Sequence, residues 1–293
     1  NNMPENIFCS LKEGQKKQFR RNQKDYDRLQ EHIGLLPVVM VAPVDQELIT
    51  EGSERRRKFL NSMIAQVDKM YLKDLISYNR VLAHRNALLK QFASSGVFDS
   101  SSLQVWDEQL VALGEIIFKK RIKFVEDFLM LFVKFYKYIA NEEELAGIKY
   151  ESQLGGTDFA ALLKNALDKD RALQYSTVGI HKDDLSFTIG GVPAKKFGSQ
   201  GQQKSFVMAL KLAHFALIKK HKNLRPILML DDLFDKLDDD RVSKILNMVH
   251  DDTFGQVFIT DTHKERLKRI LNDFDIPFYS FHVEKGNVLL ETV

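Results

Sequence analysis

Two adjacent carboxylates follow a short apolar run in the second half of the chain. The run is Ile227–Leu230, and Asp231 and Asp232 come directly after it. If the run is a strand of a parallel sheet, both acids lie at the carboxyl edge of that sheet, where ligands bind. Neighbouring carboxylates favour a cation such as hydrated Mg²⁺, so Asp231 could hold the metal through water while Asp232 orients or deprotonates an attacking water. The competing interpretation is a strand whose acids only cap the next turn.

A glycine-containing polar segment lies about thirty residues before these acids. It is Phe197–Ser205, and it runs directly into a helix predicted over residues 202–220. Glycine lets backbone N–H groups approach an anion, while the Ser199 hydroxyl and the helix N-terminus add donors and a favourable dipole. The pattern is typical of a phosphate-binding turn, although it lacks the Gly-Lys-Thr ending of a P-loop. The alternative is an ordinary turn with Ser199 as N-cap.

Strands and helices that could position these residues alternate over residues 151–293. Apolar spacing predicts the helices and short apolar runs predict the strands. The expected helices are 158–175, 202–220, 240–250 and 264–272, the expected strands are 185–189, 227–230 and 257–260, and 278–283 with 288–291 is expected to form a hairpin. This alternation favours an α/β fold with a largely parallel sheet covered by helices.

Residues 54–150 have a helical pattern instead. Apolar side chains at every third or fourth position predict two long antiparallel helices, one ending near Ala93 and one running from Ser100 to about Gly147. Residues 1–53 mix turns with a short helix expected over 27–33 and a buried strand expected over 37–41. The chain is therefore predicted to divide at residues 53 and 150.

Composition bounds the class of protein. The chain has 293 residues, of which 44% are hydrophobic and 28% charged, which excludes a disordered or fibrous protein. The net charge is only +3, so a polyanionic partner would need local basic patches. Cys9 is the one cysteine, which excludes internal disulfides and CxxC metal sites and suits a reducing cytosol. Without an apolar run of membrane length or a secretion signal, we expect a cytoplasmic protein with no membrane partner.

Basic residues cluster near the N-terminus and at the start of the helical region. They could contact the DNA backbone through its phosphates, or they could be solvated faces. The candidates for DNA contact are Lys16, Lys17, Arg20, Arg21, Arg55 and Arg56.

Together, the polar turn and the acid pair resemble motifs of the SMC-like ABC-type ATPases, and within them the RecF family. Ser199–Ser205 is similar to the RecF form of the ABC signature, Ile227–Asp232 to the Walker B strand, and Phe234–Asp238 to the D-loop. The similarity extends to Val41–Pro43, Arg55–Arg56, Arg85–Leu89, Gly179–Asp184 and His282–Gly286, and so covers nearly the whole chain.

The resemblance implies an α/β fold: an ABC-type ATPase head of the P-loop NTPase class with an inserted arm of two long helices. Residues 1–53 and 151–293 would be the two parts of the ATPase lobe, and residues 54–150 the arm. It also implies ATP and Mg²⁺ as cofactors and an ATP-dependent homodimer in which two protomers sandwich two ATP molecules.

In that dimer, the signature residues of one protomer would grip the nucleotide of the other. Asp231 would hold Mg²⁺ through water, Asp232 would orient the attacking water, and Asp238 in the D-loop would act across the interface. The signature residues are Ser199, Gln200, Gly201 and Gln202.

RecF-like function implies a weak DNA-dependent ATPase in DNA repair, replication, recombination and the SOS response. Such a clamp would bind DNA at single-strand/double-strand junctions and, with RecR and RecO, help to load RecA at gaps. One alternative is the ATPase subunit of another ABC system, such as a membrane transporter, against which the long arm and Asp232 in place of glutamate argue. The other is a helical interaction scaffold with an incomplete ATPase.

The chain departs from the family pattern in three places. No Gly-x-x-x-x-Gly-Lys-Ser/Thr motif occurs in it, so the resemblance implies that the chain begins after the Walker A loop and does not hydrolyse ATP alone. The switch histidine is replaced by Thr260 and Asp261, with His263 two residues later. Gln46 is the only nearby candidate for the Q-loop glutamine. His181 is expected to be structural.

Overall fold

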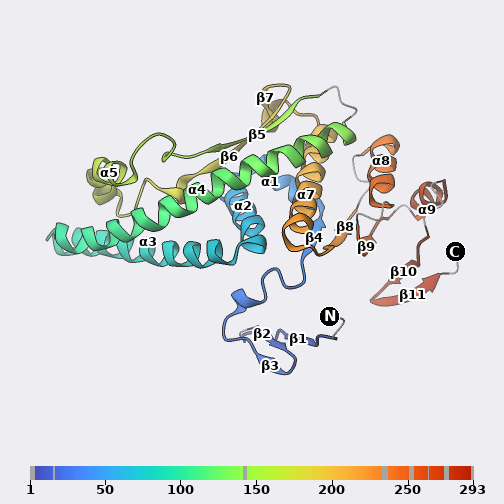
Figure 1. Ribbon diagram of the computed structural model, residues 1–293, viewed down its shortest axis with the longest axis horizontal. Coiled ribbons are helices and arrows are strands. Elements are labelled where there is room, and N and C mark those ends of the chain that lie inside the picture. The colour runs from blue at the N-terminus through green and yellow to red at the C-terminus, as the bar shows by residue number, and fades with distance from the viewer. Residues whose placement is uncertain are drawn as a thin grey trace.

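The computed structural model describes residues 4–15, 17–140, 144–232, 237–250, 254–262, 264–273 and 277–291. Two long antiparallel helices extend to one side of a body of short sheets and helices (Figure 1). The helices are α1 (Glu47–Thr50), α2 (Ser53–Val67), α3 (Lys69–Ser95), α4 (Ser100–Ile139), α5 (Phe159–Leu173), α6 (Ala194–Phe197), α7 (Gln200–Lys222), α8 (Asp239–His250) and α9 (Lys264–Asp273). Short 3-10 helices span Leu29–Glu31, Pro43–Gln46 and Ile180–Lys182.

The strands form separate small sheets. They are β1 (Ile7–Ser10), β2 (Gln18–Arg21), β3 (Lys24–Asp25), β4 (Val38–Val41), β5 (Ala146–Glu151), β6 (Asp184–Ile189), β7 (Val192–Pro193), β8 (Ile227–Leu230), β9 (Val257–Ile259), β10 (Ser280–Glu284) and β11 (Asn287–Glu291). The expected hairpin near the C-terminus is confirmed as β10–β11. At the other end of the chain, β1, β2 and β3 form an antiparallel sheet that the sequence pattern did not predict.

Strands β4, β8 and β9 form a parallel sheet in that order. Its hydrogen bonding continues past the strand ends, because the Asp231 N–H donates to the Val41 carbonyl at 2.8 Å and the Thr260 N–H to the Leu230 carbonyl at 2.9 Å. The expectation that the paired acids follow a strand at the carboxyl edge of a parallel sheet is therefore confirmed. Thr260 reaches the same edge from the neighbouring strand.

The prediction of a largely parallel sheet is wrong for the strand at 185–189. That strand, β6, lies in a separate antiparallel sheet in the order β5–β6–β7. Its partner β5 was predicted to belong to the long helix ending near Gly147, but α4 ends at Ile139. In β5 only Ile148 is fully buried, so the strand is specified by pairing with β6 more than by its own alternation.

The first long helix of the arm was also predicted as one piece and is two. The chain breaks at Asp68, which has extended backbone angles of φ −126° and ψ 100°. Its side chain accepts a hydrogen bond from the Tyr71 N–H at 2.9 Å and so begins α3 as an N-cap. The periodic apolar spacing continues across the break, which is why it concealed the interruption.

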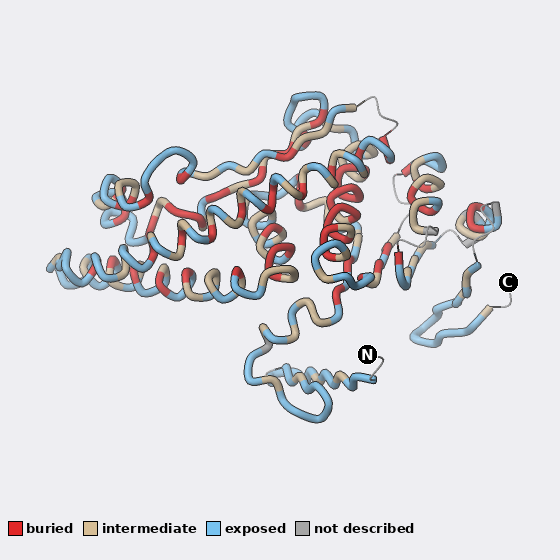
Figure 2. Tube along the Cα trace, in the orientation of Figure 1, coloured by how far each residue is buried: buried red, intermediate tan, exposed pale blue. Residues whose placement is uncertain are grey.

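Aromatic side chains spaced along α4 belong to the core. Phe128 and Phe132 are buried, and Phe132 packs on Phe206 of α7 with ring centroids 4.6 Å apart. Figure 2 shows the buried positions running along α4 and α7 where the two helices cross. Although α4 has 40 residues, no helix within the described ranges is long and apolar enough to cross a membrane.

A buried arginine joins the arm to the body. Arg121 of α4 is 1% exposed and donates to the Asp183 carboxylate at 2.6 Å and to the Ile180 carbonyl at 2.7 Å. Its remaining donors reach the Asn61 side-chain oxygen at 2.8 Å and the Tyr71 hydroxyl at 3.0 Å. One guanidinium thus holds together α2, α3, α4 and the segment that leads into β6.

That segment turns sharply at Gly179, which has φ of 126°. A Cβ atom there would lie 2.6 Å from the Tyr78 hydroxyl, so only glycine fits. His181 contacts the Tyr78 hydroxyl through Nδ1 and the Ser176 carbonyl through Nε2, both at 3.0 Å. Burial lowers the pKa of His181 to about 4, so the imidazole is neutral at pH 7. These contacts agree with the structural role expected for His181.

Candidate functional site

The paired acids and Thr260 form a hydrogen-bonded group at the edge of the parallel sheet. The Thr260 hydroxyl donates to Asp231 Oδ1 at 2.5 Å and accepts the Asp232 N–H at 3.3 Å. Asp232 has φ of 53°, in the left-handed region that aspartate tolerates better than most residues. Backbone conformations of this kind are found often at functional sites. Thr260 therefore fixes both acids, a role that its position after an apolar strand did not reveal.

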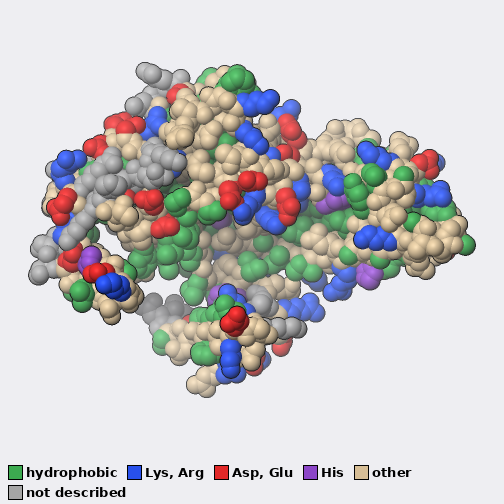
Figure 3. Space-filling view, turned by 180° about the vertical axis from the view of Figure 1, so that it is seen from behind, with side chains coloured by type: hydrophobic (Ala, Val, Ile, Leu, Met, Phe, Trp, Pro, Cys, Tyr) green, Lys and Arg blue, Asp and Glu red, His purple; other side chains and the backbone are tan. Residues whose placement is uncertain are grey.

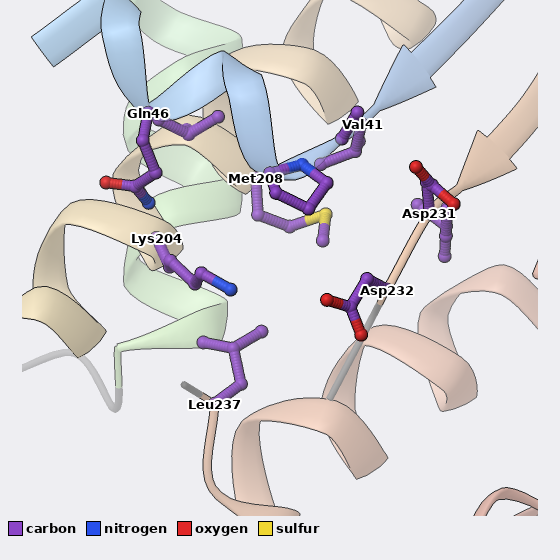
Figure 4. A pocket seen from close by; sticks show the side chains of 11 residues that line it. Val41, Gln46, Lys204, Met208, Asp231, Asp232 and Leu237 are labelled. Atoms are coloured by element: carbon purple, nitrogen blue, oxygen red, sulfur yellow. The ribbon is translucent and has the colours of Figure 1, made fainter. Parts of the chain in front are cut away.

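A small cavity of about 30 Å³ opens beside the acids. Figure 4 shows the Lys204 ammonium and the Asp232 carboxylate pointing toward one another across it, with Asp231 on the far side of Asp232. Gln46 lines the same cavity from the 3-10 helix after β4, so the structure brings the proposed Q-loop residue to the acids. The other lining residues are Val41, Ala42, Pro43, Val207, Met208, Leu230 and Leu237.

Lys211 of α7 fixes the segment that carries Gln46. Its ammonium donates to the Met40 carbonyl at 2.8 Å and to Asp45 Oδ1 at 2.7 Å. The other oxygen of Asp45 accepts the Ala42 N–H at 2.8 Å. Neither Lys204 nor Lys211 was assigned a role from sequence, because each acts through the tertiary placement of α7.

The signature turn is an N-cap as well as a candidate phosphate site. The Ser199 hydroxyl accepts the Gln202 N–H at 3.2 Å, and Gln202 Oε1 accepts the Ser199 N–H at 2.7 Å, which is a capping box. Gln203 holds the turn from inside, donating to the Ala194 and Gly198 carbonyls at 3.1 Å each. Ser199 and Gln200 stay exposed at the surface.

The signature residues do not meet the acid pair of their own chain. Ser199, Gln200, Gly201 and Gln202 are not among the residues that line the cavity beside Asp231 and Asp232. The residues of α7 that reach that cavity lie further along the helix: Lys204, Val207 and Met208. The structure thus brings together Asp231, Asp232, Thr260 and Gln46 and leaves the signature turn facing outward.

The D-loop and switch residues are partly described. Asp238 begins α8, since its carboxylate accepts the Arg241 N–H at 2.9 Å, and its side chain is 60% exposed. Asp261 is half-buried next to Thr260. The predictions for His263 and for the D-loop residues 234–236 lie outside the described residues.

The proposed DNA-contacting residues differ in how freely they are exposed. Arg56 is largely buried, with its guanidinium in a bidentate pair with Asp184 at 2.7 and 2.9 Å, so we remove it from the proposed DNA surface. Arg55 is 55% exposed and pairs with Glu47. In the N-terminal sheet, Arg20 pairs with Asp25 and Arg21 with Glu5, and both side chains remain over 40% exposed. Lys17 is exposed, and Lys16 lies outside the described residues.

The donor set of the acid pair fits a magnesium ion held chiefly by water and phosphate. In the described part of the chain, no three His, Cys, Asp or Glu side chains gather closely enough to cage a metal. Mg²⁺ commonly binds through one or two carboxylates, several waters and substrate phosphates. Asp231 offers a carboxylate at the cavity edge, and Asp232 offers a second.

Comparison with solved structures gives the class. The chain superposes on RecF described as "RecF-ATP in RecFOR pathway" with a TM-score of 0.85 and 27% sequence identity, covering 98% of this chain and 76% of that one. The protein therefore has the RecF type of ABC ATPase fold, a mixed α/β head with long helices.

Sequence comparison gives the family. No protein-family model matches the chain. It is 52% identical over 271 residues to the DNA replication and repair protein RecF of Flavobacterium johnsoniae, covering 92% of this chain and 76% of that protein. It is also 46% identical over 286 residues to RecF of Phocaeicola vulgatus, covering 97% and 76%. The chain belongs to the RecF family.

Proposed function

We propose that this chain acts as the ATP-dependent dimeric clamp of a RecF-type recombination mediator. The observation that carries the proposal is the division of the site: the acid pair lines a cavity within the chain, while the capped signature turn does not line that cavity and is exposed at Ser199 and Gln200. One chain therefore offers half of each of two sites, and two chains can complete both. The solved relative described as RecF bound to ATP in the RecFOR pathway supports ATP as the ligand.

Each residue then has a role in the dimer. Asp231 holds Mg²⁺ through water, and Asp232, fixed by Thr260, orients the water that attacks the terminal phosphate. The metal, when bound, neutralises charge on the phosphates. The start of α7 contacts the phosphate held by the partner, because the helix dipole favours an anion at the helix N-terminus. The residues that make this contact are Ser199, Gln200, Gly201 and Gln202. Asp238, at the start of α8, would act across the interface with the opposing chain.

The biological proposal follows the family. The clamp would act in the cytoplasm at single-strand/double-strand DNA junctions and, with RecR and RecO, assist the loading of RecA. We also propose that residues 54–150 form the arm, inserted between the parts of the ATPase lobe in residues 1–53 and 151–293.

Ser199→Arg tests the sandwich. In a chain with a Walker A segment ahead of residue 1, we expect unchanged nucleotide binding by the monomer and no ATP-driven dimer. The arginine side chain would fill the space into which the partner's phosphate must come. Sedimentation velocity with and without ATP measures the fraction of dimer. The fluorescence of a labelled ATP analogue measures the nucleotide affinity of the monomer. Ser100→Arg, at the exposed first turn of α4, is the matched control.

A Ser199→Arg protein that still dimerises with ATP would contradict the trans arrangement. If the unaltered protein binds nucleotide but never dimerises, the result supports the alternative, a helical scaffold with an incomplete ATPase.

DNA binding is expected to depend steeply on salt, because contacts to phosphate release counterions. Figure 3 shows Lys and Arg side chains interspersed with Asp and Glu over one face, so the contacts must come from local groups. Lys17→Gln and Arg55→Gln should each reduce the slope of log affinity against log salt by about 1. Lys58→Gln, one turn from the Arg55 position and 71% exposed, is the control. Fluorescence anisotropy with a gapped duplex measures the slope, and a flat response in the parent protein would refute these contacts.

A further inference from the structure

Glu144 connects the end of the arm to the signature turn. Its carboxylate lies a few residues after α4 and accepts two hydrogen bonds from different elements. Oε2 accepts the Tyr136 hydroxyl at 2.7 Å, and Oε1 accepts the Gln202 side-chain N–H at 2.8 Å. Tyr136 belongs to the last turn of α4, and Gln202 to the first turn of α7. One side chain thus bridges the two helices.

The donor on the arm side is rigidly placed. Tyr136 is 0% exposed, and its ring packs against Phe206 of α7 and Phe132 of α4, with centroids 5.8 and 5.9 Å away. Burial and the bond to Glu144 raise the pKa of the Tyr136 hydroxyl above its ordinary value, so it remains a donor throughout the physiological pH range. Its orientation therefore follows that of α4.

On the signature side, both the oxygen and the nitrogen of the Gln202 side-chain amide form hydrogen bonds. Gln202 gives its N–H to Glu144 while its Oε1 accepts the Ser199 N–H at 2.7 Å. The Ser199 hydroxyl in turn accepts the Gln202 backbone N–H. The orientation of the Gln202 side chain is thereby transmitted to the backbone of Ser199.

The bridge stands at one end of a long rigid element. Helix α4 has 40 residues and spans about 60 Å at 1.5 Å per residue. It packs along α3 of the arm and against α5 and α7, which follow the arm in the sequence. Tyr136 lies in the last turn of this helix, so its position depends on how α4 packs.

We propose that Glu144 is a positioning residue that couples the arm to the nucleotide-binding turn offered to the partner protomer. This inference rests on the proposed function and extends it. With the bridge intact, the position of α4 sets the orientation of Ser199, so a ligand that displaces the arm alters the affinity of the signature turn for the opposing phosphate. Glu144 itself touches no nucleotide.

The first test needs neither nucleotide nor a dimer. Tyr136→Phe removes only the hydroxyl from the bridge, and Glu144→Ala removes both acceptors. We expect hydrogen–deuterium exchange at residues 200–205 to accelerate at least tenfold in both variants, because the capping box loses its external support. Tyr138→Phe is the matched control, since it makes the same change two residues away on a side chain that is 43% exposed. Unchanged exchange in both bridge variants would overturn the inference.

The second test measures coupling in a chain with a Walker A segment. Both bridge variants should weaken ATP-driven dimerisation about tenfold, while the nucleotide affinity of the monomer stays that of the parent. Glu144→Gln retains only one acceptor oxygen and should give an intermediate value. Because the hydroxyl and the carboxylate belong to one bridge, the double variant should be no weaker than Glu144→Ala alone.

The outcomes separate the two proposals. If the parent protein never dimerises with ATP, the proposed function fails while the exchange result still decides whether the bridge orders the turn. If the parent dimerises and the bridge variants dimerise equally well, the coupling is refuted. If the double variant shows the sum of the single effects, Tyr136 and Glu144 act separately and the bridge is refuted.

Discussion

Replacing Asp232 by Asn is expected to stop ATP hydrolysis and to leave ATP-driven dimerisation intact. The amide has the shape of the carboxylate and keeps the backbone N–H contact to Thr260, and asparagine also tolerates the φ of 53° at this position. It cannot take a proton from water, and general-base catalysis is typically worth 10²–10⁴-fold. We therefore expect kcat to fall by at least about 100-fold. Phosphate release in the steady state measures the rate, and sedimentation velocity measures the dimer.

The control for this change is Asp240→Asn in the first turn of α8, because that side chain is 62% exposed and its ion pair with Lys244 contributes little, so the variant should hydrolyse ATP at a rate near that of the parent. Asp231→Asn should behave differently from both, because loss of the carboxylate proposed to hold Mg²⁺ through water would weaken nucleotide binding as well as turnover. Hydrolysis by the Asp232 variant at the parental rate would remove Asp232 from the catalytic role.

The second large effect concerns the joint between arm and body. Arg121→Met is expected to destabilise the protein by about 3–5 kcal/mol, the usual cost of leaving one member of a buried ion pair alone. Arg121 and Asp183 are each only 1% exposed as side chains. Urea unfolding followed by circular dichroism measures the change. Lys123→Met, two residues along α4, is the control, because Lys123 is 72% exposed and its ion pair with Asp127 contributes little.

The stability lost in Arg121→Met should also depend on pH. Burial raises the pKa of Asp183, and the Arg121 guanidinium opposes that rise. Without Arg121 the pKa rises further above that of the unfolded chain, so protonation stabilises the folded variant as the pH falls. The difference in stability between parent and variant should therefore shrink from pH 7 toward pH 4. A difference that is constant over this range, or a loss no larger than that of Lys123→Met, would show that the pair is not what holds the joint.

The elements that carry the acids and the signature were predictable because their signals are local. An apolar run before Asp231 is bounded by Arg225 and Pro226 on one side and by the two acids on the other, and β8 has the predicted bounds. Likewise, the serine, glycine and glutamine at the start of α7 are themselves a capping signal, which needs no information from the rest of the chain. Motifs of this kind are short and contiguous.

Other features depend on contacts between distant segments. The break at Asp68 interrupts an apolar spacing that continues on both sides, and no glycine or proline marks it. Strand β5 follows directly on a long helical pattern and is recognisable only through its pairing with β6. The bond of Thr260 to Asp231 and the bond of Gln202 to Glu144 both join residues more than twenty positions apart. No spacing rule within one element could have found them.

Helix α7 has two parts with different proposed contacts, and the ammonium of Lys211 makes the one within its own chain. In the proposed dimer the start of the helix would contact the nucleotide of a second chain, whereas Lys211 in its middle binds the turn that carries Gln46 beside the acids of its own chain. In a two-fold dimer, each α7 would contribute its start to one ATP site and its middle to the other. A change of geometry at one site would then reach the other through α7. The two hydrolysis events would therefore be coupled, and the rate at the second site would depend on the state of the first.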